Sequence, residues 1–298
     1  MGPGGPTVTG MSIHRSQAAR RGGADRPAAT SAGLGAAALA SVGRAALDLV
    51  RFLGGAAQLV TSIVGYVVAG RVSLRHTVAQ MSVIGADSLP IALITLLFAG
   101  MVLALHTAKD VVAYGATRLL GGLVAVSLAR EIGPTLTAIV VAARVGSAMA
   151  AELGSMVVTE QVDALRSLAM SPVRFLVAPR VIAGVITLPM LTVITEMVGA
   201  AGAFVVAAQW GVSWSEYLGS IRRFLTGWDL YGGLAKTAVF GLIVTLVGCW
   251  QGLRTRGGGA GVGRSTTAAV VMSIVLIYAA NFVLSDLLLR VSQGTLWR

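Results

Sequence analysis

Long apolar stretches separated by short polar segments dominate the pattern of this chain. A membrane-spanning helix needs about 20 mostly apolar residues to cross a hydrocarbon core of roughly 30 Å. Stretches of that length with few fixed charges lie at about 87–108, 119–151, 174–209, 230–253 and 265–287. The pattern therefore predicts an all-α integral membrane protein with five transmembrane helices.

The composition supports the same fold class and excludes others. Hydrophobic residues occupy 55% of the 298 positions and charged residues 12%, with a mean hydropathy of +0.81, whereas soluble domains carry roughly 25% charged residues. The 38 glycines follow no three-residue period, which excludes a collagen-like chain, and the apolar content is too high for a disordered one. The single cysteine, Cys249, excludes a disulfide framework or a thiolate metal cluster, because each needs several cysteines.

The positive residues outside the spans predict the orientation. The formal net charge is +11, and with five spans fourteen Lys and Arg residues fall on one side of the membrane against six on the other. Because cytoplasmic segments are enriched in Lys and Arg, we expect a cytoplasmic N-terminus and an external C-terminus. Arginines between membrane spans favour contacts with anionic lipid headgroups over binding of nucleic acid.

A weaker apolar stretch at 52–70 precedes the five spans. As a sixth span it would change the distribution of positive residues to eight against twelve, so we assign it to an interfacial helix at about 40–70. The first half of this helix has an apolar face and a charged face. The apolar positions are Val42, Ala46, Leu49, Leu53 and Ala57, and the charged ones are Arg44, Asp48 and Arg51. A helix packed against the transmembrane bundle is the alternative.

The N-terminal 35 residues are rich in Gly, Pro, Ala and Arg. This composition predicts a disordered cytoplasmic arm at 1–35, followed by a membrane domain at 36–298. A secretory signal peptide is the competing interpretation. It is disfavoured because its apolar core would consist mostly of Ala and Gly.

A short amphipathic helix is predicted between the second and third spans. Its two faces carry Val158, Val162, Leu165 and Ala169 on one side and Glu160, Asp163 and Ser167 on the other. We expect it to end at Ser171–Pro172, because the residue before a proline is disfavoured in helical conformation. Such a helix could transmit force from a soluble partner to the spans. From amphipathicity alone, however, a surface helix that merely connects two spans is favoured.

Charged residues accompany a predicted helix break in the second span. Gly133 and Pro134 interrupt the hydrogen-bond ladder there, and irregular backbone at membrane depth is tolerated only against protein or a water-filled cavity. Arg130 and Glu131 lie beside the break, with Lys236 in the fourth span and Glu196 in the third as candidate partners. One interpretation is a cavity for a charged headgroup, in which Arg130 or Lys236 meets phosphate. A salt bridge that only fixes helix packing is an equal alternative.

Other motifs indicate no catalytic or cofactor chemistry. The segment GGAGVGRS, Gly258 to Ser265, has P-loop spacing except that Arg264 replaces the lysine, and it lacks the flanking strand that a P-loop requires. We expect a flexible cytoplasmic turn there and no nucleotide bound by this chain. No pair of the three histidines has metal-ligand spacing, and no Ser/His/Asp arrangement is recognisable. Gly146, Ala150 and Gly154 favour close helix contacts.

The region from Leu128 to Leu191 resembles the signature region of the MlaE/YrbE permeases, the membrane subunits of MCE-associated lipid ABC transporters. The elements EIGP, ELGSM, TEQVDAL and PR occur there in order, and the resemblance covers roughly residues 40–290. It implies a non-enzymatic permease in a bacterial plasma (inner) membrane. The implied partners are a cytoplasmic ABC ATPase that binds ATP and magnesium, an MCE-domain protein on the outer face, a lipid substrate, and a second permease copy in a homodimer or a heterodimer.

The resemblance also assigns roles to residues. It places a coupling helix at 159–170 that docks on the ATPase, which reverses the preference for a merely connecting helix. The coupling positions are Thr159, Glu160, Gln161, Asp163, Ala164 and Leu165. Arg130, Glu131 and Lys236 match polar positions in or near a lipid cavity, and Leu103 lies where the first span lines an apolar pocket.

Two other functional classes remain open at this point. An ion-coupled secondary transporter could use Glu131, Glu196 and Lys236 as a relay, although such carriers usually show paired internal repeats and none is visible here. A membrane scaffold without transport activity would tolerate apolar residues in place of Arg130 and Glu131.

Overall fold

The computed structural model describes residue 43 and residues 54–70 and 72–296. The chain divides into a unit at 1–52 and a unit at 53–298, and helices α2 to α11 all belong to the second. The predicted disordered arm and the charged positions of the interfacial helix lie outside the described residues.

Long helices form the framework of the second unit. Within the described residues, five helical segments are long and apolar enough to cross a membrane: Leu89–Ala113, Thr117–Val158, Val173–Gln209, Gly227–Leu253 and Gly258–Ser292. They coincide with the five apolar stretches of the sequence, and the described residues contain no strand. The predicted all-α membrane fold is therefore confirmed.

The spans are built from the following elements. The first is α3 (Leu89–Ala113), and the second comprises η1 (Thr117–Leu119), α4 (Leu120–Ser127), η2 (Leu128–Ile132), α5 (Gly133–Val141), η3 (Ala142–Gly146) and α6 (Ser147–Val158). The others are η4 (Val173–Val177) with α8 (Ala178–Gln209), α10 (Gly227–Leu253) and α11 (Gly258–Leu296). Outside the spans lie α2 (Leu74–Gly85), α7 (Gln161–Ser167) and α9 (Trp214–Phe224).

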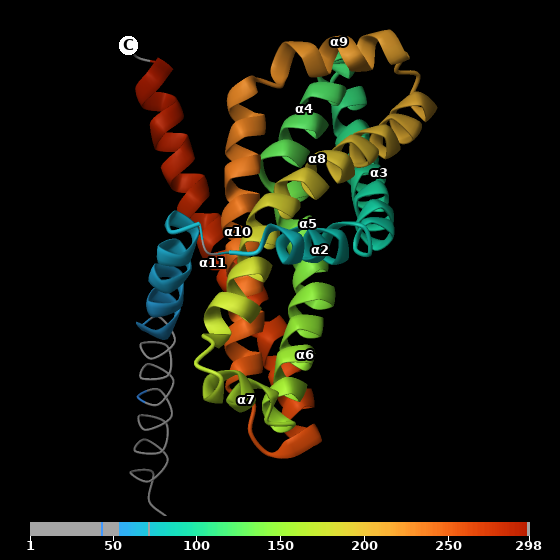
Figure 1. Cartoon of the computed structure of the whole chain (residues 1–298). Coiled ribbons are helices and arrows are strands. Elements are labelled where there is room, and N and C mark those ends of the chain that lie inside the picture. The colour runs from blue at the N-terminus through green and yellow to red at the C-terminus, as the bar shows by residue number, and fades with distance from the viewer. Residues whose placement is uncertain (1–42, 44–53, 71, 297–298) are drawn as a thin grey trace, which may run out of the picture. The chain divides into compact units, whose positions relative to one another are not determined.

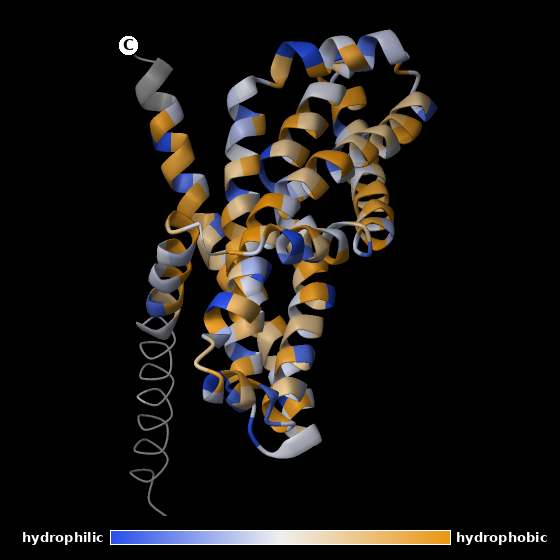
Figure 2. Ribbon diagram, viewed as in Figure 1, coloured by the Kyte–Doolittle hydropathy of each residue, from blue (hydrophilic) through white to orange (hydrophobic). Residues whose placement is uncertain are grey.

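Successive spans run in opposite directions, so their connections alternate between two ends of the bundle. Helix α7 and the α10–α11 connection lie at one end, and α9 lies at the other (Figure 1). The long helices are mostly hydrophobic, whereas hydrophilic residues gather on α7 and α9 (Figure 2). Parts of the chain that the sequence assigns to opposite faces of a membrane are thus at opposite ends.

The second span stays helical through Gly133 and Pro134, where the sequence predicts irregular backbone, although a π-turn interrupts its α-helical hydrogen-bond ladder there. Gly133 has helical dihedrals, φ −58° and ψ −58°, and Pro134 lies in the first turn of α5. The preceding element η2 is a π-helical turn, in which the amide of Gly133 donates to the carbonyl of Leu128. A proline is tolerated at the start of a helical segment, and the wider π-turn absorbs the change in hydrogen-bond register. The span is therefore altered but continuous.

Two other local predictions need correction. Helix α7 has only seven residues and ends at Ser167, before the predicted limit at Ser171–Pro172, and Pro172 instead precedes the next helical segment. The segment Gly258 to Ser265 is not a turn, because it forms the first turns of α11. The turn lies one step earlier, at Gly257, whose φ of +89° suits a glycine.

Small residues allow α6 and α10 to approach closely, as the sequence predicted for Gly146, Ala150 and Gly154. A Cβ atom on Gly248 would lie 3.0 Å from the carbonyl oxygen of Gly146, and one on Gly252 would lie 3.1 Å from that of Ala150. Helix packing at this interface is therefore set by the absence of side chains.

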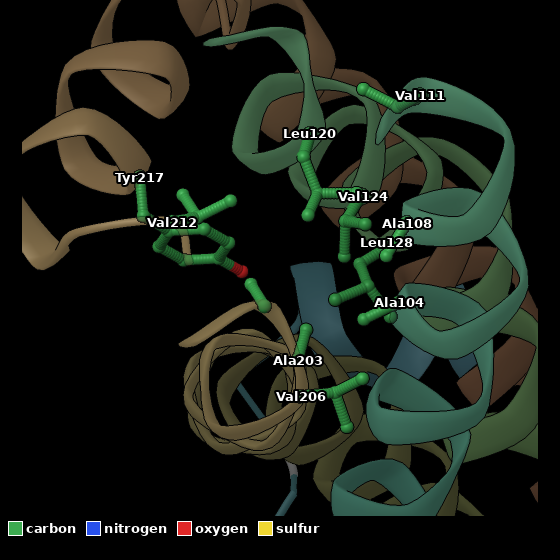
Figure 3. Packing of buried hydrophobic residues seen from close by; sticks show 11 residues of the cluster. Ala104, Ala108, Val111, Leu120, Val124, Leu128, Ala203, Val206, Val212 and Tyr217 are labelled. Atoms are coloured by element: carbon green, nitrogen blue, oxygen red, sulfur yellow. The ribbon is translucent and has the colours of Figure 1, made fainter. Parts of the chain in front are cut away.

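A buried hydrophobic cluster joins α3, α4, α8 and α9 (Figure 3). Tyr217 of α9 is buried in it and donates from its hydroxyl to the carbonyl of Ala200 at 2.9 Å. Burial raises the pKa of Tyr217 to about 12. The adjacent N-terminus of α9 is closed by a capping box of Ser213 and Glu216, and the backbone amide of Ser213 lowers the pKa of Glu216. These contacts hold α9 across one end of the bundle.

The described half of the predicted interfacial helix, Gly54–Val68, is shorter than the candidate spans. Ala56 and Ile63 are buried, whereas Ala57, predicted on the apolar face, is exposed. One stripe of this helix therefore packs against the bundle, which favours the packed alternative for its second half.

Candidate functional site

A buried lysine is the centre of a polar network between three spans. Lys236 of α10 is 3% exposed and forms an ion pair with Glu131 of η2, with 2.7 Å between Nζ and Oε1. Its Nζ also donates to the carbonyl of Arg130 and to the hydroxyl of Ser285, each at 2.8 Å. A lysine has three N–H donors, so all are used. Lys236 is thus fixed in place and has no donor left for a ligand.

Pro134 explains why the carbonyl of Arg130 accepts from a lysine. In an α-helix this oxygen would accept from the amide four residues later, which is position 134, and proline has no N–H. An unpaired carbonyl at membrane depth costs several kcal/mol. Lys236 supplies the missing donor, so the EIGP element and the fourth span are chemically linked.

Glu131 connects the second span to α11 as well. The Nδ2 of Asn281 donates to Oε2 at 2.8 Å, and the hydroxyl of Ser285 lies 2.9 Å from Oε1. The side chain of Glu131 is nevertheless 45% exposed. The carboxylate is therefore held by α10 and α11 while one side remains open.

A second ion pair lies beside the first. The Nε of Arg130 donates to Oδ1 of Asp229 at 2.5 Å, and the exposed fractions of the two side chains are 48% and 1%. Asp229 is anchored by Thr226, whose amide and hydroxyl donate to Oδ2 at 2.9 and 2.8 Å. Asp229 is not among the residues that the sequence pattern singles out. The spacing of Thr226 and Asp229 before an apolar run is that of a capping box, which could have identified it.

The two ion pairs line a common cavity of about 240 Å³. Its lining consists of Arg130, Glu131, Trp228, Asp229, Gly232, Gly233, Lys236, Ser285, Leu288, Leu289 and Ser292. Gly233 permits the close approach of α10, because a Cβ atom there would collide with the carbonyl of Ala129. The cavity thus combines two positive and two negative side chains with apolar walls.

Two predicted residues lie away from this cavity. Glu196 of α8 packs against the second span at Gly133, where a Cβ atom would collide with its side chain, and it has no hydrogen-bond or ion-pair partner among the described residues. Leu103 is partly buried against the hydrophobic cluster of α3, α4, α8 and α9. Of the candidate partners for the charged pair, the structure brings Lys236 to it and leaves Glu196 separate.

The predicted coupling residues form the exposed connection at the α7 end. Exposed side chains there are Thr159, Glu160, Gln161, Asp163 and Ala164, and Leu165 is half-buried. Val162 is buried as its face predicted, but Val158, the last residue of α6, and Ala169, which follows α7, are exposed. Glu160 has a left-handed φ of 61°, which sets the angle at which α7 leaves α6.

A larger cavity of about 510 Å³ borders α7. Its walls include Gln161, Ala164 and Leu165 together with residues of α2, α6 and α8. Arg180, the arginine of the PR element, is buried there, with 2.6 Å from its Nη2 to Oε1 of Glu152. Arg180 thereby joins the base of α8 to α6 beside the connection.

No group of three or more His, Cys, Asp or Glu side chains within the described residues could hold a metal ion. Arg130, Asp229, Glu131 and Lys236 instead pair with one another.

Comparisons with known proteins match most of this chain. The family model described as permease MlaE matches residues 77–287. A probable ABC transporter permease protein of Synechocystis is 46% identical over 231 residues, which cover 77% of this chain and 87% of the relative. A probable ABC transporter permease protein of Rickettsia felis is 36% identical over 252 residues, covering 84% of this chain and 97% of the relative.

A plant protein is also similar. Protein TRIGALACTOSYLDIACYLGLYCEROL 1, chloroplastic, of Arabidopsis thaliana is 42% identical over 221 residues, which cover 74% of this chain and 63% of the relative. The aligned region is thus less than two thirds of the plant protein. All four members of the two ion pairs of the cavity lie within residues 77–287, and so does α7.

Proposed function

Because this chain belongs to the MlaE permease family of ABC transporters, we propose that it is the membrane subunit through which a lipid passes between the membrane and an MCE-domain partner. A separate cytoplasmic ATPase supplies the work and binds ATP and magnesium, and this chain binds neither. The lipid is a phospholipid or a related hydrophobic substrate. The observation that carries the proposal is the cavity between the second span, α10 and α11, which offers charged groups beside apolar walls.

The name of the Arabidopsis relative, which refers to a glycosylated diacylglycerol, supports a lipid substrate. The chemistry of the cavity supports it too. Arg130 is half-exposed and can meet a phosphate, while Leu288 and Leu289 provide apolar surface for the adjoining part of a lipid. Lys236 is a positioning residue in this proposal, since its donors are all used within the protein.

The exposed α7 connection supports contact with an ATPase. Thr159, Glu160, Gln161 and Asp163 present polar side chains to solvent, and Asp163 pairs on the surface with Arg166 at 2.8 Å. The connection joins the second and third spans directly, so a force on it reaches both. We propose that it docks on the ATPase in the cytoplasm, with the protein in a bacterial plasma (inner) membrane and α9 outside. A second permease copy, identical or related, completes the assembly.

An ion-coupled secondary transporter is less well supported. A relay would need Glu131, Lys236 and Glu196 to exchange protons or ions. Glu131 and Lys236 are fixed in one hydrogen-bonded network, and Glu196 lies apart from it. This separation favours a structural ion pair over a relay.

Purification and reconstitution test the proposal. The tagged full chain, expressed in its own cells and extracted in mild detergent, should bring down an ABC ATPase. The complex in proteoliposomes should then move a fluorescent phospholipid to acceptor vesicles when ATP is added, with no dependence on an ion gradient. Transfer driven by a proton or sodium gradient without ATPase would establish the secondary transporter instead.

A further inference from the structure

We propose that the cavity beside Arg130 and Glu131 selects lipids with a zwitterionic headgroup, whose phosphate binds Arg130 and whose ammonium binds Glu131. This inference rests on the proposed lipid transport and adds a headgroup preference to it. Its basis is the way in which the two ion pairs present their charges to the cavity.

Each ion pair has one buried and one half-exposed member. The half-exposed member is positive in one pair and negative in the other. Asp229 is 1% exposed behind Arg130, which is 48% exposed, whereas Lys236 is 3% exposed behind Glu131, which is 45% exposed. A ligand therefore meets one positive and one negative group, from consecutive residues of the same π-turn. A free phosphate or an anionic headgroup would match only one of them.

The exposed members also retain hydrogen-bonding capacity. Within the described part of the chain, Arg130 donates only through Nε, and an arginine has four further N–H donors on its two Nη atoms. These can form the paired bonds that phosphate accepts. Among the residues that the structure describes, Oε2 of Glu131 accepts from Asn281 alone, so one of its lone pairs is available for an ammonium N–H.

Charge balance favours a ligand without net charge. The two carboxylates and two cations of the cavity neutralise one another, and the site lies within spans of high hydropathy. Adding an uncompensated charge in a medium of low dielectric constant is costly. A zwitterion adds none, whereas a headgroup with phosphate but no amine brings a negative charge next to Glu131.

An aromatic wall completes the match. Trp228 lines the same cavity and is 42% exposed. An indole face attracts ammonium and quaternary ammonium groups through cation–π interaction. The site is therefore suited to ethanolamine and choline headgroups alike.

Lipid retention by the full chain tests this preference. The protein is purified in detergent, incubated with equal amounts of phosphatidylethanolamine and phosphatidylglycerol of identical acyl chains, purified again, and its retained lipids are measured by mass spectrometry. We expect phosphatidylethanolamine to be enriched about tenfold, which corresponds to one charged contact. Phosphatidylcholine should compete with it, and inorganic phosphate should not. Equal retention of the two lipids, or displacement by inorganic phosphate, would overturn the proposal.

A substitution of Glu131 tests whether this residue binds the amine of the headgroup. Glu131→Gln keeps the size of the side chain and removes its charge, so the enrichment should disappear or reverse in favour of phosphatidylglycerol. The matched control is Glu196→Gln, which removes a membrane-depth carboxylate that does not line the cavity and should leave the enrichment unchanged. A preference that persists in Glu131→Gln, with helicity and monodispersity intact, would contradict the assignment.

The two proposals fail in different ways. If ATP-driven transfer occurs but both headgroups are retained and moved equally, the headgroup preference is wrong and lipid transport stands. If neither lipid is retained and no transfer occurs with ATP and the ATPase present, lipid transport itself is wrong.

Discussion

Lys236 supplies the hydrogen-bond donor that Pro134 lacks in the second span. Its Nζ lies 2.8 Å from the carbonyl oxygen of Arg130, which would accept from position 134 if the residue there were not proline. The same Nζ pairs with Glu131, so one ammonium group satisfies both the backbone and the side chain of the EIGP element. A polar group that is costly in a membrane thereby becomes the link between two helices.

Removal of Lys236 should destabilise the bundle as well as impair transfer. Lys236→Met leaves the carboxylate of Glu131 without its counter-ion and the Arg130 carbonyl without its donor, and we expect a loss of about 3 kcal/mol in the free energy of unfolding. Unfolding of the detergent-solubilised protein, followed by circular dichroism during SDS titration, measures this loss. Arg290→Met, which breaks an exposed pair with Asp286, is the control and should change stability little.

Restoring a backbone N–H at position 134 should make one of the hydrogen bonds of Lys236 redundant. In Pro134→Ala the new N–H can serve the Arg130 carbonyl, so one of the three bonds of Lys236 loses its importance. The destabilisation caused by Lys236→Met should then shrink by about 1 kcal/mol relative to the wild-type background. A double-mutant cycle in the same unfolding assay gives this value. Strict additivity of the two substitutions would contradict the link.

Gly233 should not tolerate a side chain. A Cβ atom there meets the backbone carbonyl of Ala129, which cannot rotate away, so Gly233→Ala should cost about 2 kcal/mol or more. Gly219 of α9 has open space around its Cβ position, and Gly219→Ala should instead stabilise the protein by about 0.5 to 1 kcal/mol through helix propensity. Thermal unfolding of the two variants should move in opposite directions.

Charge reversal on α7 should uncouple the ATPase. Glu160→Lys and Asp163→Lys change exposed side chains only, and lysine has the same left-handed strain as glutamate at position 160, so the fold should remain intact. We expect lower recovery of the ATPase with the tagged chain and a several-fold drop in coupled ATP hydrolysis. Asp110→Lys makes the same charge change at an exposed position near the C-terminal end of α3, outside the α7 connection, and serves as the control. Normal coupling in both α7 variants would place the docking surface elsewhere.

The orientation can be tested with introduced cysteines. Cys249 is the only cysteine of the chain and is buried, so the wild-type protein should be silent toward a membrane-impermeant maleimide. Arg222→Cys on α9 should be labelled in intact cells, and Asp163→Cys on α7 only after the membrane is opened. Labelling of Asp163→Cys from outside would contradict a cytoplasmic coupling helix.

The number, the approximate limits and the hydrophobic character of the spans follow from the amino-acid pattern alone. Hydropathy suffices for this, because each span must satisfy its own backbone hydrogen bonds and present apolar side chains along its length. The pattern also indicated the glycine contacts of α6 and named Lys236 and Glu196 as candidate partners for Arg130 and Glu131, since few charged residues occur at membrane depth.

Which charges meet and which remain exposed depends on how the helices pack in three dimensions. Asp229 pairs with Arg130, and Glu196 stays apart, because helix rotation and close approach at Gly233 and Gly133 bring some side chains together and separate others. The π-turn before Gly133 could not be predicted from the sequence pattern either. A proline shows that a backbone hydrogen-bond donor is missing, but not which group replaces it. These contacts depend on the relative positions of three helices, which the periodicity of a single helix does not predict.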